Sequence, residues 1–224
     1  PNLMGWKLRD DNVLEYFGYK FTNDREALAR SLDSANIFFM HAPLFHPAMK
    51  NVAPIRRELG VKTFFNMLGP MVNPAFPSRQ IVGVFSLELA RQYGYLYQQT
   101  DKRFLILHDT AGYDEISLTA PFKCFTNEGE RVWTPADLGL TRIKPEAIAG
   151  GDSVEASAKI FMEILEGRGT QAQNDVVVAN AGMALYCADG HRDLAGSLAR
   201  ARESLMSGAA RNAFRKLMDL SAAQ

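Results

Sequence analysis

The sequence predicts an α/β fold in which a largely parallel sheet is flanked by helices. Two short apolar runs, at 81–85 and 104–107, lie on either side of a stretch at 87–97 that has helical composition. Short continuous apolar runs that alternate with helices are typical of βαβ units around a buried parallel sheet. The last third of the chain also has helical spacing, so it supplies further helices to cover the sheet.

The first 60 residues predict short helices and one ordered loop. Apolar residues interleave over 13–17 and stop at Gly18, and Asn23 begins a second amphipathic stretch. Pro43 and Pro47 then exclude a regular interior helix and predict an aromatic-rich loop. A third helix is expected from about residue 48 to residue 60, with Arg56 on its apolar stripe.

Turn signals dominate 66–77, where Gly69 precedes Pro70, and the strand–helix–strand pattern described above follows from 78. Residues 116–149 hold short alternating pieces with turn residues, which predict a hairpin-like, irregular region. Asp152 with Glu155 is typical of a helix start, and further helical stripes continue to the end of the chain.

Composition excludes several classes of function. The 224 residues carry 25 Lys plus Arg and 25 Asp plus Glu, which disfavours a nucleic-acid binder with a basic excess. No apolar run approaches the roughly 20 residues that span a bilayer, and the first ten residues lack the apolar core of a signal peptide. Cys124 and Cys187 are too few for a disulfide framework and are expected to be buried and inert. A cytoplasmic protein is therefore expected.

The first candidate site is the acidic pair Asp114 and Glu115, which follows the apolar run at 104–107 after a glycine-containing turn. In open α/β sheets, ligands bind beyond the carboxyl ends of the strands. Two carboxylates there suit Mg²⁺, which commonly takes one or two carboxylates together with substrate phosphates. A solvated acidic turn is the alternative. Neighbouring His108 and Asp109 lack an evident nucleophile that would complete a triad.

Further candidates lie nearer the N-terminus. His46 lies in the proline-flanked loop, and Arg56 on its apolar stripe needs an anion or a route to water. An ordinary ion pair, with Glu58 or a distant carboxylate, explains Arg56 equally well. Gly69 and Pro70 would let the backbone approach a ligand closely, although they are also consistent with a simple turn.

Longer stretches of the chain resemble anthranilate phosphoribosyltransferases. The matching segments are HAPLFHPAMKNVAPIRRELGVKTFFNMLGPMVNPA (41–75) and HDTAGYDEISLT (108–119), followed by weaker similarity in 150–167, 176–186 and 201–210. The resemblance implies a nucleoside phosphorylase/phosphoribosyltransferase-like fold. It assigns 1–24 to the start of the α/β portion, 25–77 to part of a small helical domain and 78–224 to the α/β domain.

The resemblance also implies an activity and roles for individual residues. The reaction transfers a phosphoribosyl group from phosphoribosyl pyrophosphate to the amine of anthranilate in tryptophan biosynthesis and releases pyrophosphate. Arg56 would bind the anthranilate carboxylate, while His46, Gly69 and Pro70 would line the acceptor's path or pocket. Asp114 and Glu115 would hold Mg²⁺ on the pyrophosphate, no residue is assigned as a catalytic acid or base, and the family is usually homodimeric.

Two motifs of the family, a GTGGD-type phosphate loop and a KHGN segment, do not occur in the 224 residues. Residues 1–11 match nothing in the family. Because the phosphate loop supplies the backbone amides that bind the pyrophosphate, the chain is expected to be incomplete for catalysis alone. Two alternatives stay open: a related nucleoside phosphorylase-like or phosphoribosyltransferase-like enzyme that acts on another base, and a truncated, non-catalytic module.

Overall fold

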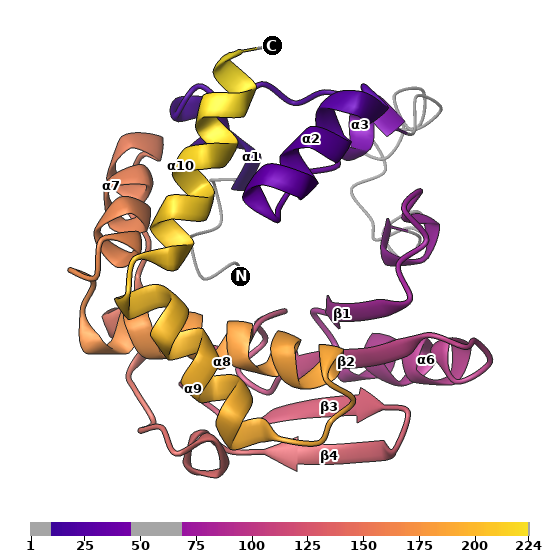
Figure 1. Cartoon of the computed structure of the whole chain (residues 1–224). Coiled ribbons are helices and arrows are strands. Elements are labelled where there is room, and N and C mark those ends of the chain that lie inside the picture. The colour runs from indigo at the N-terminus through magenta and orange to yellow at the C-terminus, as the bar shows by residue number, and fades with distance from the viewer. Residues whose placement is uncertain (1–9, 46–68, 224) are drawn as a thin grey trace, which may run out of the picture. The chain divides into compact units, whose positions relative to one another are not determined.

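The computed structural model describes residues 10–45 and 69–223, which form two compact units (Figure 1). The first unit contains residues 10–13 and 77–211, and the second contains residues 14–45, 69–76 and 212–223. The domain boundaries expected at 24 and 77 stay predictions. His46, Arg56 and the helix expected over 48–60 lie outside the described residues.

The first unit is built on a four-stranded sheet whose strands follow one another in chain order. They are β1 (Arg79–Gly83), β2 (Arg103–Asp109), β3 (Phe122–Thr126) and β4 (Gly129–Trp133). Helix α6 (Leu87–Tyr97) connects β1 to β2, and those two strands run parallel. The predicted strand–helix–strand unit is therefore confirmed, and α6 begins where Ser86 accepts a hydrogen bond from the amide of Leu89.

The α/β class is confirmed, but the expectation of a largely parallel sheet is wrong for the described strands. Only β1 and β2 are parallel, whereas β2 pairs with β3 and β3 pairs with β4 in antiparallel fashion. The connections are the reason: residues 110–121 form no helix that would carry the chain back to the start of β2, and the tight turn at Asn127–Glu128 returns it directly beside β3. The hairpin expected within 116–149 is present as β3 and β4.

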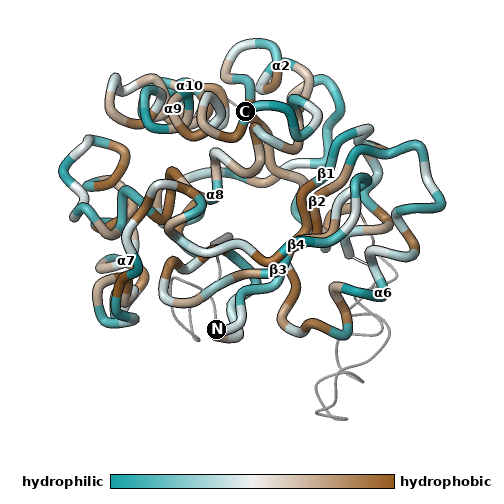
Figure 2. The backbone as a smooth tube through the Cα atoms, turned by 90° about the horizontal axis from the view of Figure 1, so that it is seen from below, coloured by the Kyte–Doolittle hydropathy of each residue, from teal (hydrophilic) through white to brown (hydrophobic). Residues whose placement is uncertain are grey.

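Strand β2 is the centre of this unit because helices cover both of its faces. Phe104, Leu105 and Ile106 are fully buried, and Figure 2 shows this stretch as one of the hydrophobic parts of the backbone trace. Leu105 and Leu107 pack in one core cluster with residues of α8 (Gln171–Ala188). Phe104 faces α6 instead, with its ring 5.5 Å from the ring of Tyr97. An unbroken apolar run is what a strand buried on both faces requires.

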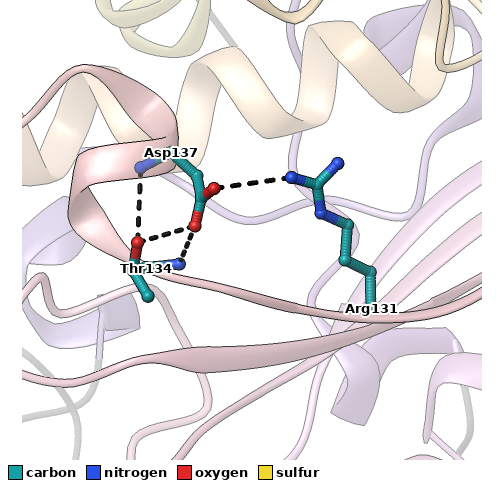
Figure 3. Close-up of polar contacts among 3 residues, drawn as sticks. All are labelled: Arg131, Thr134 and Asp137. Carbon is teal, nitrogen blue, oxygen red and sulfur yellow. Dashed lines mark hydrogen bonds and ion pairs between the residues drawn. The ribbon is translucent and has the colours of Figure 1, made fainter.

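A group of hydrogen bonds and one ion pair follows β4 and ends the hairpin (Figure 3). Thr134 and Asp137 form a capping box in which Asp137 accepts hydrogen bonds from the amide and the hydroxyl of Thr134, at 2.7 and 2.6 Å. Arg131 lies 3.4 Å from Asp137 and stacks over the ring of Trp133. The hydrogen bonds from Thr134, and then the charge of Arg131, hold the pKa of Asp137 below its usual value.

Helices complete the first unit. The short turns η2 (Pro135–Leu138) and η3 (Pro145–Ile148) precede α7 (Val154–Leu165), α8, α9 (Leu194–Met206) and the start of α10 (Ala209–Ala222). The N-cap of α7 is Ser153 rather than the predicted Asp152, because the Ser153 hydroxyl accepts from the amide of Ala156. Helix α9 packs against α8 through Ala201 and Leu205.

The second unit joins short helices around aromatic side chains. It contains the end of α1 (Asp10–Tyr16), α2 (Arg25–Ala35), α3 (Ala42–Phe45), η1 (Gly69–Val72) and the last turns of α10. Its buried core includes Leu14, Tyr19 and Leu217, with Phe21 and Phe39 packed around them. The loop predicted before residue 47 is wrong at α3, where Pro43 occupies a first-turn position that proline tolerates.

Cys124 and Cys187 are both buried and unpaired, as predicted. Burial raises the pKa of the Cys187 thiol to about 11, and it raises that of Cys124 further, so neither is a ready thiolate at neutral pH. Among the helices that the structure describes, none is both long and apolar enough to cross a bilayer.

The burial of β3 generates a stability prediction. Phe122 is fully buried in the core, so Phe122→Ala should lower the free energy of unfolding by about 3–5 kcal/mol. Val132→Ala on the neighbouring strand is the control, because Val132 is 53% exposed and should cost less than about 1 kcal/mol. Urea unfolding followed by circular dichroism measures both. Equal midpoints for the two variants would contradict this account of the core.

Candidate functional site

The candidate site lies where the parallel strands β1 and β2 end side by side. Gly83 pairs with Leu107 at the last register position of β1, and Asp109 ends β2 two residues later. The segment 110–121, here called the acidic loop, follows Asp109 and carries Asp114 and Glu115. This is the carboxyl edge of the parallel pair, where open α/β sheets bind their ligands.

A cavity of about 660 Å³ opens at this edge, and both members of the acidic pair line it. Asp114 is half-buried and Glu115 is exposed, so the pair lies on the solvent side of the cavity. Most of the remaining lining is apolar and comes from β1, β2, α7 and α8, with residues such as Ile81, Leu107, Ile160, Val176 and Ala184. The cavity therefore combines one acidic margin with an apolar interior.

Asp109 holds the acidic loop against the end of β2. Its side chain is fully buried, and its carboxylate accepts hydrogen bonds from the amide of Ala111 at 2.8 Å and from the amide and hydroxyl of Ser117 at 3.0 and 2.8 Å. The amide of Asp109 also donates to the carbonyl of Tyr113. One buried carboxylate therefore fixes both sides of the acidic pair, and its hydrogen bonds offset the cost of burying it.

The far side of the acidic loop turns through buried polar groups. Because the Ser117 hydroxyl donates to Asp109, it accepts from the hydroxyl of Thr119 at 2.7 Å, and the Thr119 amide also donates to it. Leu118, between them, has a φ of 60°, which is unfavourable for a residue with a side chain. The hydrogen bonds around it and the burial of its side chain maintain this conformation.

Two other elements fix the acidic pair from outside the loop. A Cβ atom at position 83 would overlap the carbonyl oxygen of Asp114, so only glycine at the end of β1 lets the loop approach so closely. On the other flank, Asn180 of α8 hydrogen-bonds the backbone of Ile116 through both its oxygen and its nitrogen, at 3.0 and 2.8 Å.

His108 and Asp109 do not act as part of a triad. Consecutive residues of a strand point to opposite faces, and the Nδ1 of His108 lies 2.9 Å from the carbonyl oxygen of Val84, to which it donates. This bond joins the ends of β1 and β2. Asp109, as described above, is committed to the loop.

The acidic pair fits a magnesium site that a ligand completes. Within residues 10–45 and 69–223, no group of three or more His, Cys, Asp or Glu side chains could enclose a metal ion. Two carboxylates at the edge of a cavity are what Mg²⁺ takes from a protein when phosphate oxygens and water supply its other ligands. A closed structural metal site would need more protein ligands than this margin offers.

The structure brings only some of the predicted site residues to the cavity. Asp114 and Glu115 lie together at the cavity, whereas Gly69 and Pro70 form the start of η1 in the second unit. Sequence reasoning missed the roles of Asp109 and Asn180. The available signals were an aspartate that directly ends an apolar strand and an asparagine within the apolar helical run 176–186.

Comparison with known proteins extends this picture. Residues 10–211 match the family described as "Glycosyl transferase family, a/b domain". Anthranilate phosphoribosyltransferase of Christiangramia forsetii is 58% identical over 210 residues, which are 94% of this chain and 63% of that protein. The corresponding protein of Cytophaga hutchinsonii is 51% identical over 92% of this chain and 62% of its own length. The chain thus spans about three-fifths of the curated relatives that it matches.

Solved structures show the same likeness. The crystal structure of anthranilate phosphoribosyltransferase from Thermus thermophilus superposes with a TM-score of 0.89 at 32% identity, over 99% of this chain and 67% of that one. A Saccharomyces cerevisiae anthranilate phosphoribosyltransferase in complex with PRPP and Mg gives 0.86 at 24% identity, over 96% and 61%. The likeness to the yeast protein concerns the fold alone.

The role of Asp109 generates a prediction. In Asp109→Asn, the amide nitrogen would face backbone donors that the carboxylate now accepts, so stability should fall by about 2 kcal/mol or more. The amides of Ala111 and Ser117 should also exchange faster with solvent. Asp101→Asn is the matched control, because Asp101 is exposed near the other end of β2. Unchanged exchange at both amides would contradict the role of Asp109.

Proposed function

The chain belongs to the glycosyl transferase family whose a/b domain it matches, and from this premise we propose that it carries the metal-side and acceptor-side residues of an anthranilate phosphoribosyltransferase. The activity would transfer a phosphoribosyl group to anthranilate in tryptophan biosynthesis. The observation that carries the proposal is the acidic pair, fixed at the carboxyl edge of β1 and β2 on the margin of a large cavity. The names of the relatives support the choice of substrates.

The proposed reaction exchanges one bond at C1 of the ribose for another. The bond from C1 to the pyrophosphate oxygen breaks, and pyrophosphate leaves with the electron pair. The amine nitrogen of anthranilate forms the new bond to C1 and loses a proton. Because an aromatic amine is a nucleophile without prior ionisation, positioning the two substrates matters more than a strong base. This agrees with the prediction that no side chain acts as a catalytic acid or base.

Asp114 and Glu115 would hold the Mg²⁺ of this reaction. When bound, the ion would neutralise charge on the pyrophosphate leaving group. The chain's own contribution is to keep two carboxylates at a fixed place beside β1 and β2, through Gly83 and Asp109. The rest of the cavity lining is mostly apolar and includes no Lys or Arg among the described residues, so the charged end of the donor is assigned to the acidic margin, where the metal ion would lie.

The acceptor side of the site rests on four residues. Arg56 would bind the anthranilate carboxylate through two parallel hydrogen bonds, as guanidinium groups commonly do. His46, Gly69 and Pro70 would line the path or pocket of the aromatic ring. The proposal also includes the cytoplasmic location expected from composition. It includes the homodimer that the resemblance implies.

The acidic pair supplies the test of the activity. The protein that carries this chain is supplied with anthranilate, phosphoribosyl pyrophosphate and Mg²⁺, and loss of anthranilate fluorescence is followed. The double variant Asp114→Asn, Glu115→Gln should lose at least about 100-fold in turnover, because neither side chain then carries a charge to attract the cation. The double variant Asp101→Asn, Glu203→Gln makes the same charge change at exposed positions and should keep its activity. Equal activity of the two double variants would contradict the metal assignment.

Arg56 supplies a separate test of the acceptor. Arg56→Ala should weaken anthranilate binding by about tenfold to 100-fold, which corresponds to the loss of one charge-assisted pair. Arg57→Ala is the neighbouring control, because in the helix that the sequence predicts over 48–60 adjacent side chains would point about 100° apart. Calorimetric titration with anthranilate measures both. Unchanged affinity in Arg56→Ala would favour a related enzyme that acts on a different base.

A further inference from the structure

Asn180 is a polar residue in the middle of an apolar helix. It is half-buried on α8, close in sequence to Val176, Ala179 and Met183, which are buried in the core cluster that also contains Leu105 and Leu107. Val176 and Asn180 both line the cavity. An amide in such surroundings costs stability unless its donors and acceptor are satisfied, so its partners indicate what it does.

The Asn180 side chain makes three hydrogen bonds to backbone, and two of them go to one residue of the acidic loop. Its oxygen accepts from the amide of Ile116 at 3.0 Å, and its nitrogen donates to the carbonyl of Ile116 at 2.8 Å. The nitrogen also donates to the carbonyl of Val176, one turn earlier on α8, at 2.9 Å. The third bond fixes the side chain on its own helix while the first two hold the loop.

The residue held in this way adjoins the acidic pair. Ile116 directly follows Glu115, and its own side chain is fully buried in the core. Consecutive Cα atoms are about 3.8 Å apart, so fixing both backbone groups of Ile116 restricts where the Glu115 carboxylate can lie. Gly83 limits Asp114 from the opposite flank, and Asp109 holds Tyr113 and Ser117. Asn180 is the residue of α8 that helps Gly83 and Asp109 to hold the acidic loop.

We propose that Asn180 is a positioning residue that holds the Asp114–Glu115 carboxylates at the cavity margin, so that a divalent cation binds without first ordering the loop. This rests on the proposed metal role of the acidic pair. Residues behind metal ligands that fix their orientation commonly change metal affinity by roughly 10- to 100-fold when they are removed. A residue that merely joined α8 to the loop would affect stability and leave metal affinity alone.

The chain offers a closely matched control in Asn127. Its oxygen accepts from the amide of Phe104 at 3.0 Å, and its nitrogen donates to the carbonyl of Lys102 at 2.9 Å. Asn127 therefore makes the same kind of two-sided contact with backbone, but near the start of β2, at the edge of the sheet opposite the acidic loop. Replacing the exposed Asn127 removes two side-chain hydrogen bonds to backbone away from the acidic loop.

The experiment compares Asn180→Ala with Asn127→Ala in two measurements. Mn²⁺ alone is titrated into each folded chain, and free Mn²⁺ is followed by electron paramagnetic resonance. Asn180→Ala should weaken Mn²⁺ binding about tenfold and speed amide exchange at Ile116 by at least tenfold, whereas Asn127→Ala should leave both within about twofold of the unsubstituted chain. Wild-type Mn²⁺ affinity in Asn180→Ala would overturn the proposal.

A third variant separates this proposal from the proposed function. Asp114→Asn with Glu115→Gln should abolish Mn²⁺ binding while leaving exchange at Ile116 unchanged. The titration with Mn²⁺ alone is repeated with pyrophosphate present, because phosphate oxygens complete the proposed site. If the double variant binds Mn²⁺ as tightly as the unsubstituted chain under both conditions, or if the unsubstituted chain binds none under either, the metal assignment is wrong. In that case the exchange rate at Ile116 alone decides whether Asn180 holds the loop, and unchanged exchange in Asn180→Ala overturns its positioning role.

Discussion

The buried carboxylate of Asp109 is the interaction on which the site depends. A fully buried charge at the end of an apolar strand is unfavourable unless hydrogen bonds replace its hydration. Here the replacements come from Ala111 and Ser117, which lie on either side of the acidic pair. The hydrogen bonds that satisfy the buried Asp109 carboxylate are therefore the same ones that fix the conformation of the acidic loop. The loop cannot change conformation without breaking them.

The hydrogen bonds to Asp109 can position the acidic loop because the core fixes the position of β2. Its central residues are covered by α6 on one face and by α8 on the other, so the position at which the strand ends is set by the core. The loop then meets three rigid elements: β1 at Gly83, β2 at Asp109 and α8 at Asn180. Sites built on strands and helices in this way are held more accurately than sites on free loops.

The sequence alone predicted those features that depend on residues close together in the chain. Helix α6 spans the predicted 87–97 because Ser86 caps it and apolar residues repeat along one face. The acidic pair was found because carboxylates after a buried strand are a local pattern. Strand direction is not local: the antiparallel pairing of β2 with β3 follows from where the chain returns after the acidic loop. Asn180 was missed for the same reason, since its partner Ile116 lies 64 residues earlier.

The same geometry explains why two carboxylates would suffice for the proposed metal site. The acidic margin offers two carboxylates and the rest of the cavity is mostly apolar, so the favourable place for a cation and its phosphate ligands is confined to one edge. A site with more carboxylates would bind a cation more tightly by itself, but it would repel the phosphate oxygens that must complete the coordination. Two carboxylates balance the charge of one divalent cation, so the occupied margin would carry no excess negative charge against those phosphates. Since this pair could not enclose an ion by itself, the proposed metal site would depend on the pair being held in place, and Gly83, Asp109 and Asn180 provide the contacts that hold it.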